Sequence, residues 1–223
     1  MDVLVAFAAS LVALRLAGSL ARRWRATRRP ELGVWAWSLG SYAIAAAAIA
    51  WGEAAGWDGR AFRVYYVTGG LLTAPLLGAG SLLIAGVRRA GAVALVYAGL
   101  AVGVALAMPV HGAFAAHGIP PAQDHLAFLP ARLLAILANA LGTTAAVGVA
   151  LRSLRRRPLG NVLIVLGVAA AATGSGLAGL GAGGTAVGIA VGAALLYAGF
   201  VAPARPSWRR LGMLRRASRL ETP

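Results

Sequence analysis

The chain has 223 residues, of which 60% are hydrophobic and only 12% charged, whereas about a quarter of the residues of a soluble protein are charged. This composition excludes an ordinary soluble domain and indicates an integral membrane protein. All the basic residues behind the net charge of +15 are arginines, and cysteine is absent. The chain therefore has no disulfide, no thiolate metal site and no cysteine nucleophile. Arginine in place of lysine, with abundant alanine and glycine, is typical of a bacterial protein from a GC-rich genome.

The first apolar run, 3–21, follows Asp2 and is itself followed by the basic stretch 22–29. A secretory signal peptide has the opposite order, with positive charge before its apolar run. We therefore expect this run to stay in the protein as its first membrane helix.

Seven apolar runs approach or exceed the roughly 20 residues that a helix needs to cross a bilayer. They are 3–21, 34–52, 64–87, 92–110, 131–151, 160–180 and 185–203. The sequence thus predicts an all-α fold, a polytopic membrane bundle of seven transmembrane helices in one domain, 1–204. A basic tail, 205–223, follows it.

The arginines gather at alternate ends of these runs, in the stretches 22–29, 88–89, 152–157 and 205–219. Because positive residues are retained on the cytoplasmic side, we expect the N-terminus outside, the C-terminus in the cytoplasm, and a location in the cell inner membrane. Anionic lipids at the cytoplasmic face are the expected partners of these arginines. No nucleic acid is expected, because no soluble domain carries a continuous basic face.

Small residues indicate how the helices meet. Gly184, Gly188 and Gly192 recur every four residues along one side of the last run, and Gly99 and Gly103 do so on the fourth. Such residues let another helix approach closely. Packing within the chain is the first interpretation, and a homodimer or another membrane-protein partner remains open.

Several chemistries lack the residues they need. A retinal protein requires a lysine for its Schiff base, and a haem between helices requires histidines within the spans. The histidines all lie in one external loop, as His111, His117 and His125, and their spacing with Asp124 matches no strong zinc motif. We therefore expect no cofactor, no metal and no catalytic residue; these absences favour a protein that is not an enzyme, and an enzyme remains an alternative.

Two polar residues within the spans are candidates for a functional role, Arg15 and Asn139, since polar groups are costly in a membrane. A second group gathers at the outer ends of the spans. We expect Glu53, Arg63, Tyr66 and Arg132 to form an outward-facing polar pocket covered by the 111–130 loop.

The function predicted first is that of a non-catalytic membrane subunit, sensor or assembly protein. One alternative is a small permease or channel-like solute-binding protein, and another is a membrane enzyme that acts on a lipid-linked substrate. The permease would use a polar path through the bundle. The residues expected on that path are Arg15, Thr68, Thr73, Asn139, Thr143 and Thr144.

Overall fold

The computed structural model describes residues 2–115, 118–155, 157–179 and 185–202, and their regular structure is entirely helical. The all-α prediction is thereby confirmed. The elements are α1 (Asp2–Thr27), α2 (Pro30–Ala55), α3 (Gly59–Tyr65), η1 (Tyr66–Thr73), α4 (Ala74–Ile84), α5 (Ala90–Ala107), α6 (Ala122–His125), η2 (Phe128–Arg132), α7 (Leu133–Arg152), α8 (Pro158–Gly179) and α9 (Thr185–Val201).

The long helices correspond to the apolar runs of the sequence. α3, η1 and α4 form one continuous helical span, and η2 leads into α7. Among the described residues, five spans are long and apolar enough to cross a membrane, and the apolar parts of α8 and α9 are shorter. The expected tail, 205–223, lies outside the described residues.

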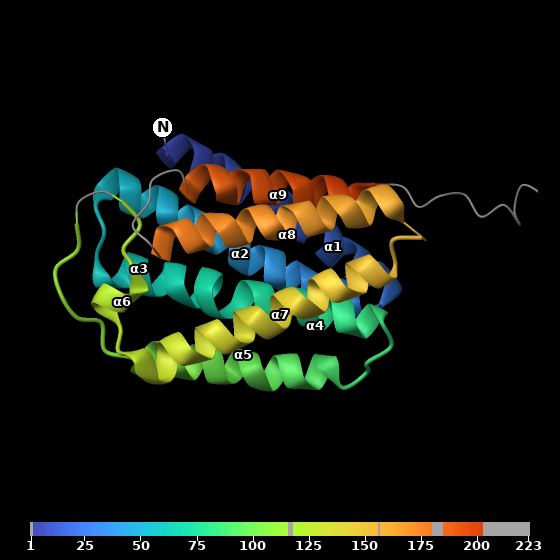
Figure 1. Cartoon of the computed structure of the whole chain (residues 1–223), viewed down its shortest axis with the longest axis horizontal. Helices are drawn as coiled ribbons and strands as arrows, with labels where there is room; N and C mark the ends of the chain where they lie inside the picture. The colour runs from blue at the N-terminus through green and yellow to red at the C-terminus, as the bar shows by residue number, and fades with distance from the viewer. Residues whose placement is uncertain (1, 116–117, 156, 180–184, 203–223) are drawn as a thin grey trace, which may run out of the picture.

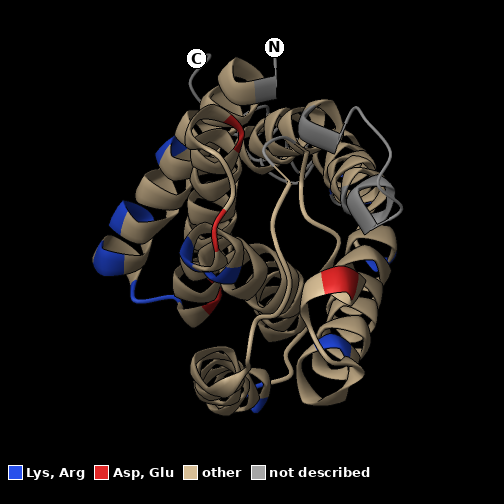
Figure 2. Ribbon diagram, turned by 90° about the vertical axis from the view of Figure 1, so that its left-hand side faces the viewer, with Lys and Arg blue, Asp and Glu red and all other residues tan. Residues whose placement is uncertain are grey.

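Six helices close into a ring. Along this ring α1 packs on α2, α2 on α4, α4 on α7, α7 on α8, α8 on α9, and α9 returns to α1. Figure 2, which looks along the bundle, shows these helices arranged around a common centre. α5 lies outside the ring against α4 and η1, so most of its apolar surface, including Leu95 and Leu106, is exposed.

Each long helical span runs in the opposite direction to the span before it, with α3, η1 and α4 counted as one span, as Figure 1 shows. The turns that follow α1, α4 and α7 therefore lie together at one end of the bundle, and the connections that follow α2 and α5 lie at the other. The first three arginine-rich stretches of the sequence lie at the end where α1, α4 and α7 finish.

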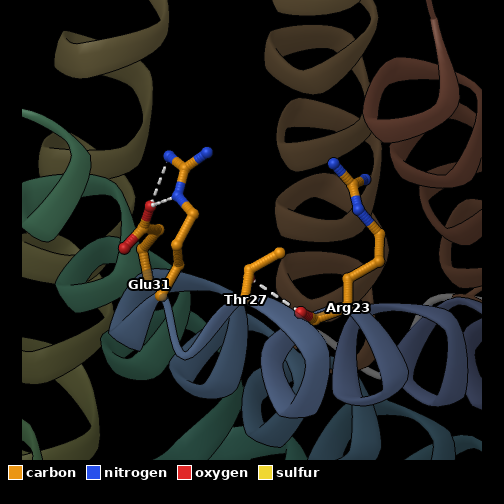
Figure 3. A network of polar contacts seen from close by, with 4 residues as sticks. Arg23, Thr27 and Glu31 are labelled. Atoms are coloured by element: carbon orange, nitrogen blue, oxygen red, sulfur yellow. Dashed lines mark hydrogen bonds and ion pairs between the residues drawn. The ribbon is translucent and has the colours of Figure 1, made fainter.

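The turn between α1 and α2 is held by an ion pair. Arg29 donates to the Glu31 carboxylate through Nε (2.7 Å) and Nη2 (2.5 Å), and Glu31 is buried. Thr27 donates to the carbonyl of Arg23 one helical turn earlier (Figure 3). Pro30 then starts α2, where its missing N–H costs no hydrogen bond.

The glycines of the last helix face α8. A Cβ at Gly188 would lie 2.9 Å from the Cα of Gly174, and one at Gly192 would lie 3.0 Å from the backbone of Ala171. The stripe therefore lets two helices of the same chain meet backbone to backbone. Gly184 lies outside the described residues. At Gly99 and Gly103, in contrast, no atom of the described residues lies within 4 Å of the place that a Cβ would occupy.

Candidate ligand cavity

A cavity of about 360 Å³ lies at the centre of the helix ring. It is bounded by α2, by the span formed from α3, η1 and α4, and by α7, α8 and α9, and the segment 120–123 of the long connection between α5 and α7 covers one end. Its lining residues are Tyr42, Ala45, Ala46, Ile49, Tyr65, Tyr66, Gly69, Gly70, Thr73, Ala74, Leu77, Pro120, Pro121, Ala122, Gln123, Asn139, Thr143, Val168, Ala171, Ala172, Ile189 and Leu196. This volume falls in the lower part of the range of small-molecule sites, roughly 300–1,000 Å³.

The third span widens beside the cavity. η1 is a π-helical segment that ends just before Pro75. Pro75 has no N–H to give to the carbonyl four or five residues earlier, which leaves the carbonyls of Leu71 and Gly70 short of a backbone donor. Side chains supply the donors: Asn139 Nδ2 bonds to Gly70 and the Tyr97 hydroxyl bonds to Leu71 at 2.7 Å. The break in the helix is thus stabilised from α7 and α5.

Most polar donors around the cavity are already used by backbone carbonyls. Tyr42 donates to Ile189 across the ring, Tyr66 donates to Ala131 at 3.3 Å, and Thr73 donates to Thr68 at 2.7 Å. Such bonds are required, because an unpaired polar group in an apolar interior costs several kcal/mol.

Two hydroxyls on the cavity wall differ from the others. Those of Tyr65 and Thr143 make no hydrogen bond to another described residue. Tyr65 is half-buried with its ring edge-on to Trp57, and Thr143 is half-buried on α7, one turn from Asn139. They are therefore donors that a bound molecule can use.

The long connection between α5 and α7 is held over the cavity at two places. The His125 ring stacks on Phe114 with a centroid separation of 4.2 Å, and the fully buried Phe62 packs against both. The backbone N–H of His111 donates to the His125 carbonyl, and Nδ1 of His125 lies 2.9 Å from the His111 carbonyl oxygen. Because a carbonyl only accepts, Nδ1 carries the proton. The second fastening is Glu53, whose Oε2 accepts from the backbone N–H of Gly118 at 3.3 Å.

The charged residues expected in the outer pocket have separate partners. Glu53 Oε1 also accepts from Trp57 Nε1 at 3.2 Å. Arg63 donates to the carbonyls of Ala105 and Leu106, so it caps the C-terminal end of α5. The only ion pair between described residues is Arg29–Glu31, so Glu53 and Arg63 do not pair with each other.

The other expected residues lie at different depths. Tyr66 lines the cavity and joins the third span to the start of α7 through its bond to Ala131. The Arg132 guanidinium lies 5.6 Å from the centre of the Phe128 ring, a cation–π distance. Asn139 faces the cavity, whereas Arg15 is exposed on the outside of α1.

The polar path expected for a permease is present only in part. Thr73, Asn139 and Thr143 line the cavity. Thr68 is bonded to the carbonyl of Val64 instead, and Thr144 is exposed.

Sequence reasoning missed Tyr42, Tyr65 and Tyr97, as well as the buried Glu31. The available signal was that Tyr42 and Tyr97 occur inside the expected spans 34–52 and 92–110, away from the head-group boundary where aromatic residues normally gather. A phenol at that depth needs a partner for its hydroxyl, and such a partner is provided by an interrupted helix or by a cavity.

The described histidines of the connection between α5 and α7 are not gathered as a metal site. In the part of the chain that the structure describes, no three His, Cys, Asp or Glu residues lie close enough to hold one ion. His125 is buried among aromatic rings, and His117 lies outside the described residues.

These features define a class: an α-helical protein with several helices long and apolar enough to span a membrane, arranged around a small central cavity. No protein family, curated protein or solved structure matches the chain.

Proposed function

We propose that the protein is a seven-span bacterial inner-membrane protein that binds a small solute in its central cavity, as a small permease or solute-binding protein does. The observation that carries this proposal is the cavity itself, which is enclosed by five of the ring helices and reached by two hydroxyls that bond to no other described residue. Pockets of this kind, apolar with a few convergent polar groups, are typical ligand sites.

Seven crossings are supported by the ring. α8 and α9 are mostly apolar and complete the circle between α7 and α1, so they share the environment of their neighbours. With seven crossings the two termini lie on opposite sides of the membrane.

The orientation rests on the arginine-rich turns that lie at one end of the bundle (Figure 1). Arg22, Arg25, Arg88 and Arg152 are among their exposed residues. Placing that end in the cytoplasm satisfies the positive-inside rule and puts these guanidinium groups beside anionic head groups. The N-terminus and the connection that covers the cavity then lie outside.

Binding is favoured over acid–base chemistry because the lining residues include no carboxylate, histidine or arginine. A reaction on a lipid-linked substrate needs a group that accepts or donates a proton at the reacting atom. Glu53, an acid that holds the connection over the cavity, is engaged by Trp57 and Gly118.

A role as a subunit of a larger assembly is the second proposal. It is favoured by α5, whose outward face is apolar and carries Gly99 and Gly103 with no described neighbour. A second copy of the chain or another membrane protein would pack closely there.

Single cysteines test the topology, because the natural chain has none. In intact cells a membrane-impermeant maleimide is expected to label Ala115→Cys from outside and to label Arg155→Cys only after the cells are opened. Both residues are exposed at opposite ends of the bundle, so the reagent reports the side and not burial. Labelling of Arg155→Cys in intact cells would show that the proposed orientation is wrong.

The cavity is tested with two cysteines on α7. Thr143→Cys lines the cavity, whereas the control Leu141→Cys is 72% exposed on the outer face of the same helix, towards lipid. A thiol reacts as its thiolate, which forms only where water reaches it. We expect methyl methanethiosulfonate to modify Thr143→Cys at least about 10-fold faster than Leu141→Cys. Equal, slow modification of both would mean that no solute enters the cavity and would refute the proposed function.

A further inference from the structure

We infer that the cavity takes an uncharged, largely apolar molecule with a carbonyl, ether or hydroxyl oxygen, which accepts hydrogen bonds from Tyr65 and Thr143. This inference rests on the proposed function and names the chemical class of its solute.

We infer an uncharged solute from the residues that line the cavity. None of the cavity-lining residues carries a charge, and the largest aliphatic side chains among them come from α2, α4, α8 and α9. They are Ile49, Leu77, Val168, Ile189 and Leu196. An ion moved from water into such a site loses its hydration without gaining a counter-charge, which is costly.

The direction of the hydrogen bonds follows from which groups remain available. The amide N–H groups of Asn139 already donate to the carbonyls of Gly70 and Ala135. The hydroxyls of Tyr42, Tyr66 and Thr73 donate to carbonyls as well.

Of the hydroxyl groups on the cavity wall, those of Tyr65 and Thr143 are the ones that make no bond to another described residue. They come from different walls, the third span and α7, and both border the same space. A solute that offers an acceptor oxygen satisfies them, whereas a pure hydrocarbon leaves both hydroxyls unpaired.

Four probes of one shape separate these requirements: acetophenone, cumene, benzoate and benzamidinium. Each carries one phenyl ring and one branched group, so they differ in the acceptor and the charge. Their binding is measured by thermal unfolding of the full chain in phosphatidylcholine nanodiscs. Ala172→Phe, which adds a phenyl ring at a position that lines the cavity, serves as the blank, and Ala169→Phe, at a position of the same helix that does not line the cavity, is its matched control.

We expect acetophenone to bind the parent and Ala169→Phe, and the two ions to bind at least about 100-fold more weakly. Tyr65→Phe keeps the ring against Trp57, and Thr143→Val keeps the side-chain shape, yet each removes one donor. Each is expected to weaken acetophenone roughly 3- to 10-fold and to leave cumene unchanged.

The failures are distinguishable. If no probe binds, or every probe binds Ala172→Phe as well as the parent, solute binding in the cavity is refuted and the proposed function fails with it. If benzoate or benzamidinium binds within about 10-fold of acetophenone, the neutral class is wrong while cavity binding stands. If Tyr65→Phe and Thr143→Val weaken acetophenone no more than cumene, the assignment of the two hydroxyls is wrong.

Discussion

Replacing Gly142 with leucine is expected to destroy the folded bundle, the largest effect of any single substitution considered for this protein. A Cβ at this position would meet the carbonyl oxygen of Ala74 and would lie 2.7 Å from the Cα of Pro75. The obstacles are backbone atoms of α4, which cannot rotate away, so the two helices must separate. Overpacking of a core typically costs about 1–3 kcal/mol even where side chains can give way, and here we expect a larger loss.

The matched control is Gly148→Leu on the same helix, where no atom of the described residues lies within 4 Å of the Cβ position. Leucine is the better helix former by up to about 1 kcal/mol, so this variant is expected to be as stable as the parent or slightly more stable. Size-exclusion profiles and melting temperatures in detergent compare the two. A Gly142→Leu protein that is as monodisperse and heat-stable as Gly148→Leu would show that α4 and α7 do not touch.

The long apolar helices could be predicted from the sequence because each depends on a local property. A run of about 20 apolar residues is a helix that crosses a membrane wherever it occurs, and arginines mark the ends of these runs. α2 (Pro30–Ala55) extends beyond the expected 34–52 because its first and last turns are polar and lie past the apolar core. Hydropathy does not register such turns.

The close contacts between helices could not be predicted in the same way. The sequence drew attention to Gly99 and Gly103, which lie on an open face, and not to Gly142, which meets the backbone of α4. The spacing of glycines along one helix shows that the helix has a face of small residues. Which face meets another helix depends on the whole ring.

The same limit applies to the outer charges. Glu53 and Arg63 lie near the same end of the bundle, as their positions in the chain indicated, but each has a partner from a distant segment. Arg63 binds the end of α5, and Glu53 binds the loop backbone at Gly118. Backbone carbonyls and N–H groups carry no signal in the sequence, so these partners of the two side chains could not be predicted from it.

Replacing Asn139 with leucine is expected to loosen the third span beside the cavity. The Asn139 amide donates to the Gly70 carbonyl, one of the two that Pro75 leaves without a backbone donor. Leucine has a similar volume and no donor, so this carbonyl would be left unpaired in an apolar interior. The expected cost is about 1–3 kcal/mol of unfolding free energy, with faster amide hydrogen exchange in the segment 66–74 than in the parent.

Two further variants separate the hydrogen bond from packing. Ala140→Leu changes an exposed neighbour on α7 and is expected to leave both stability and exchange unchanged. Asn139→Asp keeps the shape of the side chain but donates only when its carboxyl group is protonated. At neutral pH the aspartate must either be buried with its charge or take up a proton from water, and both cost free energy. We therefore expect this variant to be less stable than the parent. Faster exchange along the whole chain in Asn139→Leu, and not chiefly in 66–74, would mean that Asn139 supports the bundle in general. Its bond to Gly70 would then not be what holds the interrupted span.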